Sequence, residues 1–150
     1  MMPETKQLCT FRLGDQAFGV DALTVQELIR HQTMTRVPQA PTSIRGLINL
    51  RGQIVTAIDL RSRLRMPPLD NGRNPMNVVI RSDDGPVSLL VDQIGDVIEV
   101  DEACFEAPPD TLEGEAREFI RGAYKLADRL LLLLDCELAI HVNGENSKNN

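Results

Sequence analysis

The sequence contains few aromatic residues and no excess of positive charge. Its 150 residues include four Phe, one Tyr and no Trp, which leaves little material for stacking on nucleobases or sugar rings. The formal net charge is −6, whereas proteins that bind nucleic acid normally carry a basic face. We therefore expect no nucleic-acid partner. An apolar fraction of 42% suffices for one ordinary domain, or for two very small ones that share a core.

Groups for catalysis are also scarce. His31 and His141 are the only histidines and are separated by most of the chain. The sequence has no paired-His helix, Cys-x-x-Cys pair, phosphate loop or nucleophile elbow. We therefore expect no enzyme, no cofactor and no metal centre, although carboxylates alone leave a metal site open. Cys9, Cys104 and Cys136 have apolar surroundings, which predicts small buried hydrophobes in a reducing cytosol rather than disulfides.

Long apolar runs and a leader sequence are missing as well. The apolar run Leu130–Leu134 is far shorter than the ~20 residues that cross a bilayer. Residues 1–6 lack the basic and apolar regions of a signal peptide. We expect a soluble cytoplasmic protein in which residues 130–134 form a buried strand.

What the chain does contain is an internal repeat. Ile44-Arg45-Gly46 is followed by Asp59 at the end of an apolar run, and Ile120-Arg121-Gly122 is followed at the same spacing by Asp135. Each copy of this β-rich unit is about 70 residues long. Where the copies agree, packing is the expected reason, and where they differ, function is. A second shared segment lies upstream of each copy, namely Val20-Asp21-Ala22-Leu23 and Val91-Asp92-Gln93-Ile94.

Apolar alternation and turn residues predict many short strands and little helix. This pattern is typical of two small barrels, with Ile58 and Leu132 inside them. Residues 21–29 fit a short helix followed by a strand as well as they fit one strand. Residues 1–6 and 143–150 are expected to be frayed tails. Strands are expected at residues 8–13, 17–20, 47–60 (a hairpin that turns at 51–53), 78–80, 88–91, 94–100, 119–126 and 130–134.

Four aspartates recur at equivalent places in the two copies, which favours capping and turn-making over acid–base chemistry. Short helices are expected after Asp59 and after Asp135, and residues 113–118 are expected to form an exposed loop. The four aspartates are Asp21, Asp59, Asp92 and Asp135.

The copies differ most at the first hairpin turn. It contains Arg51-Gly52, whereas the second copy has Ala127-Asp128-Arg129. An Arg beside Gly at a hairpin tip holds a planar guanidinium on an exposed support, which suits a partner's carboxylate. A solvated turn residue explains the pattern equally well. The second asymmetric element is Val25-Gln26-Glu27, where spacing alone favours ordinary core packing.

Eight ordered segments, spread over about residues 7–141, are specific in combination, although none is specific alone. They are Leu13-Gly14-Asp15-x-x-Phe18-Gly19-Val20-Asp21, Val25-Gln26-Glu27, Arg36-Val37-Pro38-x-x-Pro41, Ile44-Arg45-Gly46-x-x-Asn49-Leu50-Arg51-Gly52, Ile58-Asp59-Leu60-Arg61, Val91-Asp92-x-x-x-Asp96-Val97, Ile120-x-Gly122 and Leu133-Leu134-Asp135. Together they resemble the CheW family, the coupling adaptors of bacterial chemosensory arrays. The halves would be about 7–66 and 76–141.

The resemblance implies a mainly β fold of two intertwined five-stranded barrels similar to SH3 domains, with a hydrophobic groove between them. It implies an adaptor without catalytic activity. Such an adaptor binds the cytoplasmic tip of methyl-accepting chemoreceptors and the regulatory domain of the histidine kinase CheA, so that receptor state controls autophosphorylation. Membrane association would be indirect, through receptors. The open alternatives are an adaptor of a non-motility chemosensory pathway and a general SH3-like protein-binding module.

The resemblance also assigns residues to receptor or array coupling. Ser88 departs from the family, which often has Gly at this position, and is expected to affect how closely a partner backbone approaches. Thr56, where the family often has Pro, would be tolerated in a strand. The coupling residues implied are Val25, Glu27, Gly46, Asn49, Arg51, Ile94, Asp96 and Val97.

Overall fold

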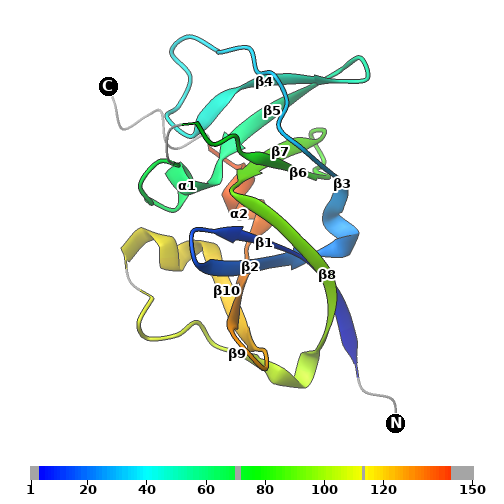
Figure 1. The fold of residues 1–150 in the computed structure, drawn as a ribbon, viewed down its shortest axis with the longest axis vertical. Coiled ribbons are helices and arrows are strands. Elements are labelled where there is room, and N and C mark those ends of the chain that lie inside the picture. The colour runs from blue at the N-terminus through cyan, green and yellow to red at the C-terminus, as the bar shows by residue number, and fades with distance from the viewer. Residues whose placement is uncertain (1–3, 70–71, 113, 143–150) are drawn as a thin grey trace.

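The computed structural model describes residues 4–69, 72–112 and 114–142, which form short strands and a few single-turn helices (Figure 1). The elements are β1 (Thr5–Leu13), β2 (Gln16–Asp21), the 3-10 helix η1 (Ala22–Thr24), β3 (Val25–Ile29), β4 (Ile44–Leu50), β5 (Gln53–Asp59), α1 (Leu60–Arg63), β6 (Met76–Ile80), β7 (Val87–Val91), β8 (Gln93–Asp101), η2 (Glu102–Cys104), β9 (Phe105–Glu106), η3 (Gly114–Phe119), β10 (Ile120–Lys125), β11 (Leu130–Leu134) and α2 (Cys136–Ile140).

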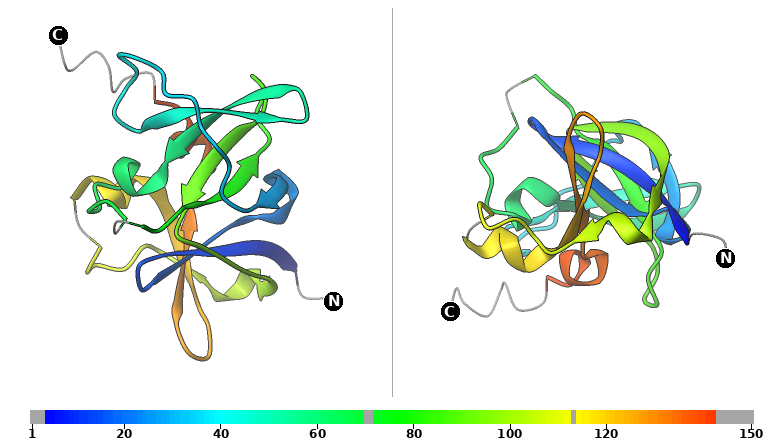
Figure 2. Two further views of the ribbon diagram at one scale, coloured as in Figure 1. Left: turned by 45° about the horizontal axis from the view of Figure 1, so that its top comes forward. Right: turned by 90° about the horizontal axis from the view of Figure 1, so that it is seen from below.

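The two copies of the repeat are intertwined, as expected. One sheet has the strand order β8-β1-β2-β11-β10-β9 and the other β3-β6-β7-β5-β4. Each copy therefore gives its first hairpin, β1–β2 or β6–β7, to the sheet built mainly from the other copy. The parallel pairs β2–β11 and β5–β7 complete the exchange. The hairpins β4–β5 and β10–β11 lie at opposite ends of the molecule (Figure 1; Figure 2, left).

Each sheet curls round so that the chain leaving one edge reaches the opposite hairpin. After the edge strand β3, Thr35 makes an isolated antiparallel bridge with Leu47 of β4. After the edge strand β8, the short strand β9 pairs with β10, Phe105 opposite Tyr124. The same closing step is thus used twice, which confirms two small barrels related by the repeat.

These crossing points explain why both copies carry the segment Ile-Arg-Gly. A Cβ atom at Gly46 would lie 2.6 Å from the carbonyl oxygen of Thr35, and one at Gly122 would lie 2.5 Å from that of Glu106. Both distances are shorter than real Cβ contacts and involve backbone oxygens, and at Gly122 the ring of Phe105 would also lie 2.3 Å away. Only glycine therefore lets the crossing segment approach the hairpin this closely.

Gly46→Ala is expected to lower the free energy of unfolding by about 1–3 kcal/mol, the usual cost of overpacking. Gly52 is the matched control, because a Cβ added at this position would meet no atom within 4 Å. Gly52→Asn should change stability by less than about 1 kcal/mol, since Asn tolerates the positive φ of this position. Urea denaturation of the three proteins measures the difference. Equal stabilities would show that the backbone at Gly46 yields freely.

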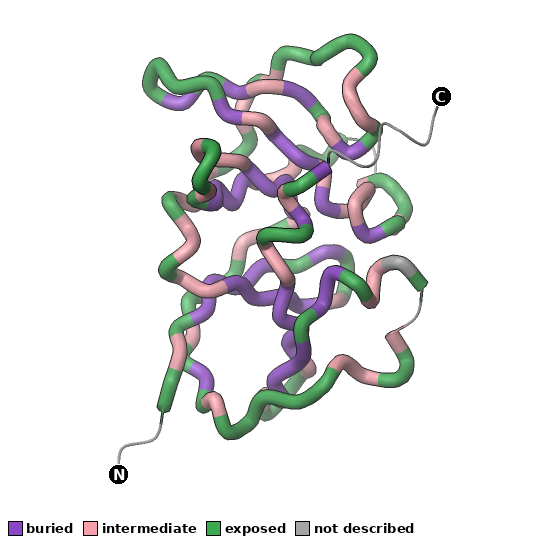
Figure 3. The backbone as a smooth tube through the Cα atoms, turned by 180° about the vertical axis from the view of Figure 1, so that it is seen from behind, coloured by how far each residue is buried: buried purple, intermediate pink, exposed green. Residues whose placement is uncertain are grey.

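The core has three parts, one inside each barrel and one between them. β11 serves two of them, because Leu131 and Leu133 face the interior of their own barrel while Leu132 and Leu134 face the central core. This double burial accounts for the uninterrupted apolar run. Ile58 and Leu132, expected inside the barrels, are buried at 1% and 3% exposure but belong to the central core between the barrels. In Figure 3 buried residues gather on the strands at the centre of the molecule, whereas the edge strands β3, β8 and β9 are mostly exposed or partly buried.

Several local expectations are confirmed and others are wrong. Asp59 and Asp135 cap α1 and α2, and residues 21–29 form a 3-10 turn followed by a strand. Residues 113–118 were expected as an exposed loop, but η3 spans Gly114–Phe119 and so also includes Phe119, which was expected to begin a strand. Residue 113 lies outside the described residues. Thr5 and Lys6, expected in a frayed tail, pair with β8. Residues 1–3 and 143–150, which belong to the expected tails, lie outside the described residues.

The cysteine prediction is correct only in part. Cys9, Cys104 and Cys136 are free thiols, as expected. Cys9 is buried and Cys136 partly buried, but Cys104 is exposed because it ends η2 on the outside of the barrel.

Candidate functional site

The turn of the β4–β5 hairpin is a two-residue turn in which both central residues have positive φ. The values are 52° for Arg51 and 88° for Gly52, a combination that fits the twist of antiparallel strands. Asn49 supports the turn, because its Oδ1 accepts a hydrogen bond of 2.8 Å from the amide of Gly52. An Arg in the left-handed region is unusual and costs about 1 kcal/mol. An arginine therefore occupies a position whose backbone conformation favours glycine or asparagine.

Arg51 forms an ion pair with Glu27, which joins two of the predicted coupling residues. Nη2 of Arg51 donates to Oε2 of Glu27. Glu27 lies on β3 and Arg51 follows β4, the two edge strands of the same sheet, so the pair ties the barrel across its seam. The hydrogen bond and the charge of Glu27 raise the pKa of Arg51 above its ordinary value. The Arg51 side chain is 71% exposed and that of Glu27 21%.

Val25 holds the strand that carries Glu27. It is partly buried and packs against the central core. Arg81 fixes the backbone at the start of β3. Its Nη1 donates to the carbonyl oxygens of Leu23 at 3.0 Å and Val25 at 2.8 Å. The bulge between Val25 and Glu27 then sets the direction of the Glu27 side chain.

Gly46 is buried under the Thr35 crossing and presents no side chain to a partner. Its repeat equivalent Gly122 has the same environment in the other barrel. If Gly46 affects coupling, it must do so indirectly, by setting the position of β4.

The remaining coupling residues lie on β8, in the other sheet. Ile94 is partly buried and packs on the central core, whereas Asp96 is exposed and Val97 is 51% exposed. The carbonyl oxygen of Asp96 accepts a hydrogen bond of 2.6 Å from Oγ1 of Thr10, which fixes β8 at an irregularity in its pairing with β1. The predicted residues therefore form two groups in two sheets.

Sequence reasoning missed two exposed apolar side chains near these groups. Ile54 is 60% exposed and pairs with Asn49 beside the Arg51 turn. Leu23 is 83% exposed and lies in η1, directly before β3. Both interrupt the expected alternation, which was the available signal. Ser88, expected to affect the approach of a partner, is fully buried, and its Oγ donates to Oδ1 of Asn77.

Over residues 4–69, 72–112 and 114–142, no group of three or more His, Cys, Asp or Glu is placed to hold a metal ion. His31 is exposed, and Nδ1 of His141 lies against the carbonyl oxygen of Glu137. In the same described part of the chain, no helix has the length and apolar character needed to span a membrane.

Comparisons with known proteins agree on one family. A family model described as a CheW-like domain matches residues 7–143. The chain is 32% identical over 136 residues to chemotaxis protein CheW of Treponema pallidum (strain Nichols), covering 88% of this chain and 80% of that protein. It is 33% identical over 132 residues to the probable chemotaxis protein CheW of Rhizobium etli, covering 88% and 85%.

The fold comparison covers the molecule as a whole. The crystal structure of the scaffolding protein TtCheW from Thermoanaerobacter tengcongensis superposes with a TM-score of 0.83 at 28% identity, covering 97% of both chains. The family match, the relatives and the shared two-barrel fold agree, and the chain belongs to the family of CheW-like domains.

Proposed function

We propose that this protein is a non-catalytic adaptor that couples the cytoplasmic tips of methyl-accepting chemoreceptors to the regulatory domain of the histidine kinase CheA. Receptor state would then control kinase autophosphorylation. The protein would work in the cytoplasm and reach the inner face of the membrane only through receptors. Relatives named as chemotaxis and scaffolding proteins support this proposal.

The observation that carries the proposal is the Glu27–Arg51 pair at the β4–β5 hairpin. The pair faces solvent on the Arg51 side, and Ile54 presents an exposed apolar surface on the same hairpin. A guanidinium has five N–H donors, so one that is held by Glu27 can still meet a partner carboxylate. A charged anchor beside an apolar one is a common composition for a protein-binding surface.

The second proposed surface is the exposed part of β8 with Asp96 and Val97. It belongs to the other sheet, so one partner could hold each barrel. Because each sheet contains strands from both copies, the barrels are coupled through the shared core, and a shift at one surface is felt at the other. Contacts of modest strength gain affinity when many such units assemble.

Calorimetric titration of the protein into the isolated regulatory domain of CheA from the same genome tests the proposal. Saturable one-to-one binding is the expected result. Absence of heat against every such domain in that genome would contradict it and favour a general SH3-like binding module. Binding to the regulatory domain of a kinase from a non-motility pathway would assign the adaptor to that pathway.

Arg51→Ala is expected to abolish most receptor-dependent kinase activation while leaving the fold intact. The side chain is 71% exposed, so its loss removes little packing, and an exposed ion pair contributes little to stability because water screens it. Reconstituted phosphorylation with receptor and kinase measures the first effect, and thermal melting measures the second.

Arg129→Ala is the matched control, because Arg129 is an exposed residue at the turn of the equivalent hairpin β10–β11. It should leave both activity and melting temperature near those of the unmodified protein. If Arg51→Ala lowered the melting temperature and the activity together, its role would be structural.

A further inference from the structure

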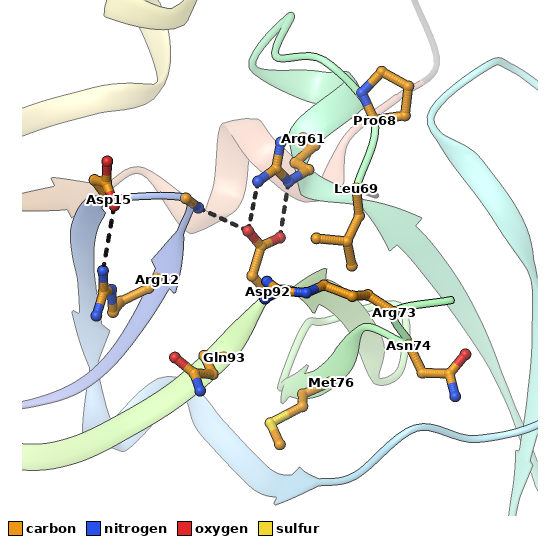
Figure 4. Close-up of a pocket in the computed structure, with 11 residues that line it drawn as sticks. Arg12, Asp15, Arg61, Pro68, Leu69, Arg73, Asn74, Met76, Asp92 and Gln93 are labelled. Atoms are coloured by element: carbon orange, nitrogen blue, oxygen red, sulfur yellow. Dashed lines mark hydrogen bonds and ion pairs between the residues drawn. The ribbon is translucent and has the colours of Figure 1, made fainter. Parts of the chain in front are cut away.

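A cavity of about 580 Å³ lies where the two sheets meet, and none of the proposed coupling residues lines it (Figure 4). One wall comes from β1 and the β1–β2 turn, and another from α1 and the segment between α1 and β6, which supplies Pro68, Leu69, Arg73 and Asn74. The remaining wall comes from the start of β6 and the junction of β7 and β8. The lining residues are Arg12, Gly14, Asp15, Arg61, Pro68, Leu69, Arg73, Asn74, Met76, Asp92 and Gln93.

The back of the cavity is a rigid ion pair. Nε and Nη2 of Arg61 donate to the two carboxylate oxygens of Asp92 at 2.8 and 2.5 Å, and the amide of Gly14 donates to Oδ2 at 2.7 Å. Nη1 of Arg61 donates to the carbonyl oxygen of Pro67 at 2.7 Å. Asp92 therefore has its charge neutralised and both oxygens bonded. It opposes an incoming anion less than an unpaired carboxylate would.

Two further arginines line the cavity and are available to a ligand. Arg12 is half exposed, and its only ion pair among the described residues is with Asp15 at 3.7 Å, an exposed pair that is easily separated. Arg73 is exposed and makes no hydrogen bond within residues 4–69, 72–112 and 114–142. In Figure 4 its guanidinium reaches toward Asp92, whose pKa it helps to lower.

The charge of the cavity differs from that of the chain. Its lining holds three arginines and two aspartates, whereas the whole protein has a net charge of −6. The amides of Asn74 and Gln93 add hydrogen-bond donors, and Leu69 and Met76 add an apolar surface. This combination suits a ligand that carries both carboxylates and an apolar side chain.

The repeat supplies an internal comparison. Aligning Asp59 with Asp135 places Glu137 of α2 at the position of Arg61, and aligning the upstream segments places Asp21 at the position of Asp92. The equivalent place therefore pairs no arginine with the aspartate, which instead accepts from the amide of Leu23 and meets Lys6 at 3.8 Å. Among the described residues, the Arg61–Asp92 pair thus has no equivalent at Asp21 and Glu137, so packing of the repeat does not require an arginine at this place.

We propose that this cavity binds a short acidic peptide segment of a partner protein, with Arg12 and Arg73 contacting its carboxylates and Leu69 and Met76 its apolar side chain. The site goes beyond the proposed coupling function, because it uses none of the coupling residues. Its charged lining also differs from the hydrophobic groove that the family resemblance implies. Because both sheets supply its walls, an occupant would hold the barrels in one relative position.

Fluorescence anisotropy of a labelled Glu-Leu-Glu-Glu peptide against the full chain tests the site. The matched peptide Gln-Leu-Gln-Gln has the same shape without charge. We expect saturable binding of the acidic peptide only, and an affinity that falls as salt rises, because the contacts are partly exposed. If the acidic peptide showed no saturable binding, or if both peptides bound equally, the proposal would be overturned.

The double variant Arg12→Gln/Arg73→Gln should lower the affinity for the acidic peptide by about tenfold or more, because two charge-assisted contacts are lost. Arg36→Gln/Arg129→Gln removes the same charge from exposed positions outside the cavity and should leave the affinity within about twofold. Equal weakening by both variants would indicate a diffuse surface effect and overturn the site. If inorganic phosphate at the same concentration as the peptide displaced it, the site would be a phosphate site, and the peptide proposal would be overturned.

Discussion

A chain cut between residues 70 and 71 is expected to yield two fragments that are each unfolded alone and fold when mixed. The first fragment keeps the hairpins β1–β2 and β4–β5, but these belong to different sheets, and β3 loses β6, its pairing partner. The second fragment keeps the hairpin β6–β7 and the strands β9–β11, while β8 loses β1. Isolated two-stranded hairpins are marginally stable at best in water.

The central core explains why neither fragment can compensate. It brings together Phe11 and Leu60 from the first copy with Val78, Leu89 and Leu132 from the second. A fragment would expose its share of this apolar surface, and burial of such side chains contributes about 1.5–3 kcal/mol each. The loss of several such contacts is therefore comparable to the 5–15 kcal/mol by which an ordinary domain is stable.

Far-UV circular dichroism and amide dispersion in NMR spectra measure the result for each fragment and for the equimolar mixture. Native-like spectra only in the mixture are expected. Since the copies are related, a fragment could also pair with a second copy of itself, and a concentration series would reveal this. A fragment that unfolds cooperatively as a monomer would contradict the intertwined arrangement.

The repeat predicted the two barrels but not the exchange of hairpins between them. Equal spacing from Ile44 to Asp59 and from Ile120 to Asp135 shows that two units are alike. It carries no information on whether β1–β2 completes its own copy or the other one, because both arrangements bury the same apolar faces. The connection between β7 and β8 is what separates the first hairpin of the second copy from the rest of that copy. Asp92 is the only residue between these two strands, and they belong to different sheets.

Gly46 shows how one residue can satisfy a packing interpretation and a functional one. Agreement between the copies predicted packing, and the 2.6 Å that would separate an added Cβ from the Thr35 oxygen supports this. The resemblance assigned the same glycine to coupling, which remains a prediction. The crossing segment at residue 35 has no repeat signature in the sequence, so the reason for the glycine could not be found there.

Difference between the copies was the better guide at the hairpin tip. It singled out Arg51, which is exposed as expected. Its partner Glu27 was also among the predicted residues, but their contact crosses the seam of a barrel, and no local pattern predicts which edges meet. The sequence interpretation named no partner for Arg51 within the chain, and the structure supplies one in Glu27.

Asp92 was predicted to cap or to make a turn, by analogy with the other repeated aspartates. Asp21 and Asp59 do cap their helices. Asp92 instead binds Arg61 and the amide of Gly14, because β8 follows it at once and leaves no helix to cap. A bond between residues 31 positions apart in sequence has no local signal, and the cavity beside it was missed for the same reason.

Asp92→Asn is expected to lower the free energy of unfolding by about 3 kcal/mol near neutral pH, because removing one partner of a buried pair leaves the other charge uncompensated. The side chains of Arg61 and Asp92 are 14% and 11% exposed, so solvent screens the pair little. Asp96→Asn is the matched control. Its carboxylate is exposed, and it should change stability by less than about 0.5 kcal/mol.

The effect of Asp92→Asn should depend on pH in a defined direction. Burial alone would raise the pKa of Asp92, but the bonds from Arg61 and Gly14 and the charges of Arg61 and Arg73 outweigh it, so the pKa lies below the ordinary 3.8. A carboxyl with a lowered folded pKa contributes stability above its unfolded pKa and loses it as pH falls through the folded pKa. Urea denaturation at several pH values between about 6 and 3 should therefore show the unmodified protein approaching the variant at the acidic end. If the difference in the free energy of unfolding stayed constant with pH, the packing of the Asp92 side chain, and not its charge, would account for its contribution to stability.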